Sequence, residues 1–355
     1  MAIGTARLAR DIVFTLEKKS PEIAFNIFLN NGVLAVMGMQ KRVKLVRGGN
    51  RFDERTHLGQ NSTVDHRSKF AQIPTDFQNN WLTAQYGQAV ISGTGIVNMV
   101  EAQQNAGKEK LDDLAEKTLE EANLTFPNKV GDGLMAATSA ANGPVSIVET
   151  IEATAFGAQT SSLGGISRGD HTGLTDTTDA WQNQYNATAI ADISAAAGKA
   201  AIQKFYWECS PGGSGKGETP DIGLTTTGVF AKMSGGEDAL RRYSPSDRML
   251  KLGFDALMVN NASIIADRNV GAGNLYFLNT NYLRFQILAG NNTKTTGAVQ
   301  PIGNDGQPVQ SIPLQVSKAV ESDDFLNWTI KMWLVYNLTF CGLRQHGLQA
   351  SITEA

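Results

Sequence analysis

One pentapeptide of this 355-residue chain has the residue types of a catalytic nucleophile. Gly165-Ile166-Ser167-Arg168-Gly169 matches Gly-x-Ser-x-Gly, the sharp turn that exposes the nucleophilic serine of α/β-hydrolases. That chemistry needs a strand before the serine, a helix after it, and a histidine from a distant segment. Polar, glycine-rich sequence surrounds Ser167, and His346 is the one histidine that follows His171. The sequence therefore favours a surface loop, and a serine hydrolase using Ser167 stays as the enzyme alternative.

A second glycine-rich segment, residues 212–217, has some features of a phosphate-binding loop. A Walker loop has the pattern Gly-x-x-x-x-Gly-Lys-Ser/Thr. Here Ser210 stands at the first glycine position, and Gly217 stands where the magnesium-binding hydroxyl belongs. Because two fixed positions fail, we predict a flexible loop that faces solvent or a neighbour, and no bound nucleotide.

The histidines offer little metal chemistry. His57 and His66 lie near Asp53, Glu54 and Asp65, a set that could imitate a metal cluster. The four histidines of the chain nevertheless share no metal-ligand spacing. A solvated or intersubunit polar face explains them better, so we predict no catalytic residues, no metal and no cofactor.

Composition places the chain among ordinary soluble proteins. Its hydrophobic content of 41% supports a sizeable core, and its length suggests about two domains. With 31 basic and 34 acidic residues it has a formal charge of −3, which excludes the global basic field that non-specific nucleic-acid binding needs. Cys209 and Cys341 fit neither a disulfide framework nor a zinc knuckle, so we expect reduced thiols.

Neither a secretory signal nor a membrane span is expected. Residues 1–10 contain two arginines without a continuous apolar segment behind them. No window of the sequence reaches the roughly 18 apolar residues that a membrane helix needs.

Residues 48–97 form an extended segment that is far longer than an ordinary connection, since loops in compact domains average about 4–6 residues. Strand-like runs stand at both of its ends, which predicts a hairpin that reaches away from its own domain. Such a hairpin has no core of its own, so we predict that it packs on another chain. An ordinary solvated loop stays as the alternative. The charged and aromatic residues that we predict to contact another chain are Arg51, Asp53, Glu54, Arg55, Asp65, Arg67, Lys69, Trp81 and Tyr86.

Periodicity predicts the elements around this segment. Alternating residues predict strands over 41–47 and 81–96, and over 256–259, 263–266, 275–278, 282–287 and 328–340. Apolar spacings of three and four predict an amphipathic helix over about 105–126 that ends at Pro127, and a shorter helix over 129–140. Further helical structure is expected over 181–185 and then 187–204, running into a strand-like 205–207, and over 238–252.

The order of these elements resembles the major capsid proteins of tailed bacteriophages with the Hong Kong 97 fold. The phrases that carry the resemblance are Gly48-Gly49-Asn50-Arg51-Phe52-Asp53-Glu54, Leu82-Thr83-Ala84-Gln85-Tyr86, Asn105-Ala106-Gly107, Gly253-Phe254-Asp255 and the run from Leu275 to Leu283. The resemblance covers most of the chain, but it consists of element order and short phrases and includes no catalytic signature.

The resemblance implies an α+β capsid fold in four parts. Residues 1–40 would be an N-terminal arm, and 48–97 an extended loop that lies across an adjacent subunit. Residues 41–47, 98–149 and 281–340 would form a peripheral domain whose long spine helix spans about 105–126. Residues 150–280 and 341–355 would form an axial domain.

The resemblance also implies a mechanical function and a set of partners. Copies of the chain would assemble as hexamers and pentamers into an icosahedral shell around double-stranded DNA, which they would contact non-specifically. Portal, separate scaffolding and decoration proteins would be further partners, and the shell would form in the host bacterial cytoplasm and persist as the virion capsid. Gly48, Gly49, Gly93 and Gly95 would be hinges at the base of the hairpin. An encapsulin-like shell that encloses enzyme cargo is the second alternative.

Overall fold

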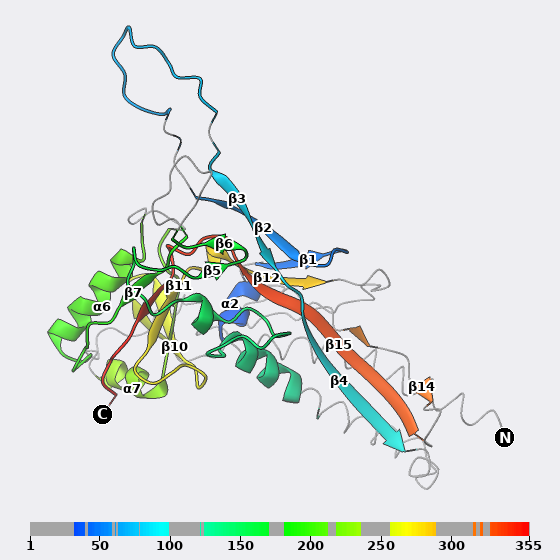
Figure 1. Ribbon diagram of the computed structural model, residues 1–355. Helices are drawn as coiled ribbons and strands as arrows, with labels where there is room; N and C mark the ends of the chain where they lie inside the picture. The colour runs from blue at the N-terminus through cyan, green and yellow to red at the C-terminus, as the bar shows by residue number, and fades with distance from the viewer. Residues whose placement is uncertain are drawn as a thin grey trace.

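The computed structural model describes residues 32–39, 42–58, 61, 63–77, 79–98, 121, 124–169, 181–211, 218–235, 256–288, 315–316, 320–321 and 327–354. Two six-stranded sheets form the body, and a long two-stranded hairpin rises from it (Figure 1). The predicted α+β class is confirmed.

The first sheet is built on one long strand. β15 (Asn327–Phe340) pairs with β4 (Ala89–Asn98) in antiparallel register from Asn327↔Asn98 to Tyr336↔Ala89. Along β15 the buried residues Met332, Leu334 and Tyr336 alternate with more exposed ones, as a half-buried strand requires. The strand predicted over 328–340 is therefore confirmed. The sheet also contains β1 (Val43–Val46), β12 (Leu283–Leu288), β13 (Gln315–Val316) and β14 (Val320–Glu321).

The second sheet is buried on both faces at its centre. Its strands, in spatial order, are β7 (Gln184–Asn186), β16 (Gly347–Gln349), β11 (Leu275–Leu278), β8 (Ile222–Thr225), β10 (Ala262–Ala266) and β9 (Ala256–Val259). All four residues of β8 and of β11 are buried. Continuous apolar runs of this kind are typical of strands covered on both faces.

The two faces of the second sheet contact different layers. On one face Ile264 and Phe277 pack against α6 (Ala196–Glu208) and α7 (Thr227–Gly235). On the other face Leu224 and Tyr276 share one hydrophobic core with first-sheet residues such as Phe285 and Leu338. The body is thus layered as helices, second sheet and first sheet.

One prediction about the N-terminal third needs correction. The helix α2 (Gly32–Met39) lies within residues 1–40, which we assigned to an N-terminal arm, but Leu34 and Met37 are fully buried in the shared core. Residues 32–39 therefore belong to the body, because burying their apolar side chains in its core is more favourable than exposing them to water on an arm. Residues 1–31 lie outside the described part of the chain.

The helices of the middle third also differ from the prediction. Residues 124–134 form one helix, so Pro127 does not end a helix there. The Asn128 side chain donates to the Leu124 carbonyl at 2.9 Å, which satisfies one carbonyl of this turn. Most of the helix predicted over 105–126 lies outside the described residues, as does the one predicted over 238–252. The strand-like 205–207 is the last part of α6, where Phe205 and Tyr206 are buried.

The hairpin, residues 52–86, is called the arm from here on. Its strands β2 (Phe52–His57) and β3 (Trp81–Tyr86) pair antiparallel from Phe52↔Tyr86 to His57↔Trp81. Figure 1 shows the connection between them extending far from the body. The predicted return strand is two strands, because β4 turns back into the first sheet. Residues 89–97 are therefore part of the body and not of the extended loop.

The four glycines proposed as hinges lie in different surroundings. Gly48 and Gly49 have φ of +77° and +93° between β1 and β2, where the left-handed region favours glycine. Gly93 and Gly95 lie inside β4, paired with Met332 and Ile330. Their place in a continuous ladder contradicts the prediction that they lie at the base of the hairpin.

Candidate assembly interface

The connection between β2 and β3 exposes apolar side chains. Phe70 and Phe77 are each 91% exposed, Val64 is 80% exposed and Ile73 is 74% exposed. Trp81, at the start of β3, is 56% exposed, and its ring lies tilted at 59° to that of His57 with the ring centroids 4.8 Å apart. Apolar groups that are exposed together on one projecting element indicate an interaction surface, because their exposure to water is unfavourable. The arm therefore presents a surface that a partner would cover.

The polar groups at the base of the arm bond to one another. Arg51 donates to the side chain of Gln85 at 2.7 Å, and its Nε lies 3.3 Å from a carboxylate oxygen of Asp53. Arg55, which lies on β2 with Asp53, is also exposed. These exposed pairs contribute about 0–1 kcal/mol each to the free energy of unfolding. Stability of the single chain therefore does not explain why charged residues stand at these positions.

Charged groups of the connection bond to its own backbone. Arg67 donates to the carbonyls of Thr63 and Gln72 at 3.0 and 3.4 Å. Asp65 accepts the backbone N–H of His66 at 2.7 Å. The ammonium of Lys69 lies 5.7 Å from the centroid of the Phe70 ring. Contacts of Arg51, Asp53, Arg55, Asp65, Arg67, Lys69 and Trp81 with another chain stay predictions.

The prediction that Glu54 contacts another chain is wrong. Glu54 faces the body and holds the arm to it. The residue is 6% exposed and points from β2 toward the first sheet. Its carboxylate accepts from Lys44 Nζ at 3.2 Å and from the side-chain amide of Gln286, and it lies 3.8 Å from Arg284 Nε. Cys341 Sγ lies 3.5 Å from the same carboxylate, and burial together with Glu54 raises the pKa of this thiol to about 11.

Tyr86 is a second internal anchor and not a contact between chains. Its hydroxyl donates to the carbonyl of Phe340 at 2.9 Å, and burial raises the pKa of the phenol. Opposite it on β2, Phe52 is also buried in the shared core. The arm is thus attached to the end of β15 by the hydrogen bonds of Tyr86 with Phe340 and by the burial of Phe52 in the same core.

The Gly-x-Ser-x-Gly pentapeptide does not form a nucleophile elbow over residues 162–169. Ser167 ends β6 (Ile166–Ser167), which returns from β5 (Ser162–Leu163) through a turn at Gly164 and Gly165. His346 is fully buried, and burial lowers the pKa of its imidazole to about 3. Its Nδ1 accepts the backbone N–H of Asn279 at 3.2 Å. His171 lies outside the described residues, as do residues 212–217.

Other chemistry is equally sparse in the part of the chain that the structure describes. No group of three or more His, Cys, Asp and Glu residues there could hold a metal ion. Cys209 and Cys341 are free thiols. Among the described helices none is both long and apolar enough to cross a membrane.

The predicted contact residues are seven charged residues with Trp81 and Tyr86, and they omit the exposed apolar residues of the connection. Val64, Phe70, Ile73 and Phe77 follow neither the period of a strand nor that of a helix. The available signal was different: large apolar residues recur inside a polar segment that predicts no element able to bury them.

With this geometry established, comparison with solved structures defines the class: the fold is that of a phage major capsid protein. The capsid asymmetric unit of cyanophage A-1(L) matches with a TM-score of 0.59 and 15% identity, over 90% of this chain and 92% of that one. The capsid of the native GTA particle matches with a TM-score of 0.50 and 10% identity, over 89% and 90%. No protein-family model and no curated protein matches the sequence. At these identities the likeness shows the fold.

Proposed function

We propose that the chain is the major capsid protein of a tailed double-stranded DNA bacteriophage, with a Hong Kong 97-type fold. Copies would assemble as hexamers and pentamers into an icosahedral shell. The observation that carries the proposal is the arm, which projects from a body with a capsid fold (Figure 1). Its connection exposes Phe70, Ile73 and Phe77. A chain that remained monomeric would leave these side chains in water.

The layout of the body supports a peripheral and an axial domain. The first sheet would be the centre of the peripheral domain, made from 41–47, 98–149 and 281–340, with β4 added to it. The second sheet with α6 and α7 would be the axial domain, made from 150–280 and 341–355. The chain passes from the first sheet to the second, returns to the first and ends in the second with β16, as this division requires.

The proposed partners follow from the proposed shell. They are further copies of the chain, a portal, a separate scaffolding protein, a decoration protein, and packaged DNA held by non-specific contact. Assembly would take place in the host bacterial cytoplasm, and the finished protein would reside in the virion capsid.

Negative-stain microscopy of the expressed chain tests the proposal directly. We expect uniform closed shells or hexameric capsomers, and a chain that stays monomeric at every concentration would refute the proposal. Replacement of Phe70 and Phe77 by serine should abolish these particles, because the arm would lose its largest exposed apolar groups. Thr75→Ser, at an exposed polar position of the same connection, is the matched control and should assemble normally.

The contents of purified particles separate a phage capsid from an encapsulin-like shell. A phage capsid purified from infected cells should contain double-stranded DNA, whereas an encapsulin-like shell should contain a cargo enzyme. The hydrolase alternative requires esterase or amidase activity that Ser167→Ala removes. Equal activity in wild type and variant would dispose of that alternative.

A further inference from the structure

The short hairpin β5–β6 contacts the base of the arm through its turn. Gly164 and Gly165 have φ of +60° and +78°, the left-handed conformation that a tight two-residue turn requires. The carbonyl of Gly164 accepts the backbone N–H of Gln85, in β3, at 2.8 Å. A Cβ added to Gly164 would lie 2.9 Å from Cβ of Ala84, whereas a Cβ on Gly165 would meet no atom within 4 Å. Of the two glycines, Gly164 is therefore the one in close contact with the arm.

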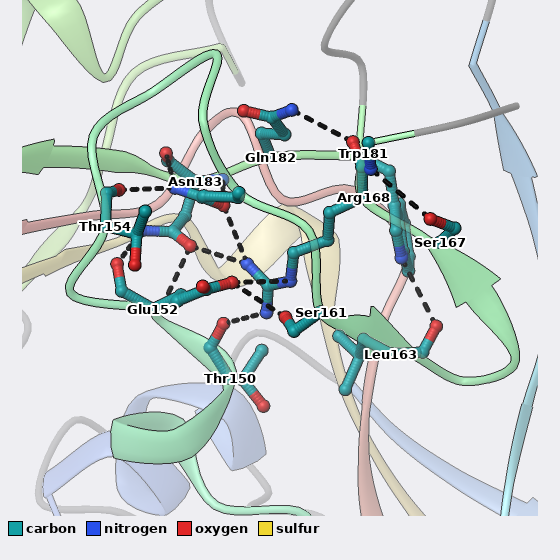
Figure 2. A network of polar contacts seen from close by, with 12 residues as sticks. Thr150, Glu152, Thr154, Ser161, Leu163, Ser167, Arg168, Trp181, Gln182 and Asn183 are labelled. Carbon is teal, nitrogen blue, oxygen red and sulfur yellow. Dashed lines mark hydrogen bonds and ion pairs between the residues drawn. The ribbon is translucent and has the colours of Figure 1, made fainter.

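Arg168, immediately after β6, fixes this hairpin to the body. Figure 2 shows its guanidinium surrounded by polar groups from two neighbouring segments. It donates to Gln159 Oε1 at 2.9 Å, to Asn183 Oδ1 at 2.7 Å and to the carbonyl of Thr150. Its Nε lies 3.6 Å from Glu152. One side chain thus joins residues 150–159 and 183 to the end of β6.

The network is buried, so its geometry is strongly specified. Arg168 is 2% exposed, and burial lowers the pKa of its guanidinium while the nearby Glu152 opposes that shift. A buried charge is costly without its partners, which disfavours any arrangement that separates them. The backbone N–H of Arg168 donates to the carbonyl of Ser161 at 2.9 Å, which continues the pairing of β5 with β6.

The indole of Trp181 adds a second attachment for the hairpin. Its Nε1 donates to the carbonyl of Leu163 at 3.3 Å, and the ring is fully buried in the shared core. Ile166 of β6 is buried in the same core as Ala84 and Tyr86 of β3. The turn at Gly164 is therefore held rigidly beside the arm.

An arm made of two strands needs such support. A two-stranded hairpin alone is marginally stable in water, and the tip of this one contributes exposed apolar groups. Glu54 and Tyr86 attach the arm to the first sheet, and the Gly164 carbonyl contacts β3 separately from them. Contacts from two directions restrict the angle at which the arm leaves the body.

We propose that the β5–β6 hairpin, held by Arg168, is a brace that sets the direction of the arm on its own subunit before the arm meets a neighbour. Arg168 is then a positioning residue for assembly that acts through Gly164. The importance of the brace for assembly rests on the proposed function. The contact itself can be tested on the unassembled chain.

Hydrogen exchange of the full chain at low concentration, where neighbours do not cover the arm, tests the contact. The variants are Gly164→Ala and Gly165→Ala, which share the positive-φ strain and differ in contact with β3. In Gly164→Ala the amides of β2 and β3 should exchange about tenfold to a hundredfold faster than in Gly165→Ala, because an overpacked turn releases the arm. Amides of β8 and β11 should be unchanged in both. Equal exchange of the arm in the two variants would overturn the proposal.

Arg168→Lys tests the positioning residue in the same experiment. Lysine keeps the charge but cannot reproduce the planar fork toward Gln159, Asn183 and Thr150. We expect faster exchange in β5, β6, β2 and β3 with β8 and β11 unchanged. Faster exchange throughout the chain would show a general structural role, and unchanged exchange would show no role; either result overturns the assignment. Failure of the shell proposal would appear separately, as missing wild-type particles in the microscope.

Discussion

At the residue scale, His346 is a buried neutral histidine whose titration links stability to pH. Its pKa of about 3 in the folded chain lies below its ordinary value of 6.5, so the unfolded chain binds the proton more tightly. Stability should therefore be lost as pH falls below 6.5, by at most about 1.4 kcal/mol per pH unit from this group. Urea unfolding at pH values from about 5 to 7 measures the slope, above the range of ordinary carboxylates.

His346→Gln should reduce that slope, because glutamine offers an acceptor to Asn279 without titrating. The matched control for the loss of one histidine is His57→Gln, at an exposed position of β2. A slope that His346→Gln leaves unchanged would mean that other groups cause the loss of stability in acid.

Glu54 illustrates how one carboxylate can join the arm to the body. Glu54→Gln removes the charge opposite Lys44 and Arg284 while the shape is kept. Hydrogen bonds to charged groups contribute about 1.5–3 kcal/mol, and we expect the low end because both cations are partly exposed. Asp53→Asn, at the adjacent exposed position, should change the free energy of unfolding by less than about 0.5 kcal/mol. Equal urea midpoints for the two variants would contradict the anchoring role of Glu54.

At the element scale, Gly93 joins β4 to the helix over 124–134 by close packing. A Cβ on Gly93 would lie 2.7 Å from the ring of Phe126, which is buried. Gly93→Ala should therefore destabilise the chain by about 1–3 kcal/mol, although alanine is ordinarily the better strand residue. Gly87→Ala, where an added Cβ meets nothing within 4 Å, is the control. If Gly93→Ala is as stable as the control in urea, the helix can shift to accept the added methyl group, and close packing at Gly93 does not join the two elements.

Elements with a clear period were predictable from the sequence, and those decided by distant contacts were not. Residues 328–340 alternate regularly, so the strand β15 could be predicted. The run 205–207 has aromatic residues that favour strands, yet α6 continues through it because Phe205 and Tyr206 pack on Phe277. For the candidate site, the length of 48–97 indicated an arm, but the inward direction of Glu54 depends on Gln286, far away in sequence.

At the scale of the whole molecule, the second sheet couples the layers of the body. Tyr276 and Leu278 of β11 enter the core shared with the first sheet, while Leu275 and Phe277 enter the core under α6 and α7. Alternate residues of β11 thus contribute to the two cores. If either core is lost, β11 becomes exposed and the other core loses part of its packing. Peripheral and axial domains, although separate in the proposed layout, should therefore unfold together.

This coupling predicts one urea transition for the unassembled chain. Leu338→Ala in the first sheet and Phe277→Ala in the second should each lower the free energy of unfolding by about 2–5 kcal/mol, since both side chains are fully buried. Circular dichroism and tryptophan fluorescence should give coincident midpoints in wild type and in both variants. Phe70→Ser should leave the midpoint in place, because that side chain is 91% exposed on the arm and stabilises no part of the body. Two separated transitions, or a midpoint that Leu338→Ala shifts for one probe alone, would show that the sheets fold independently.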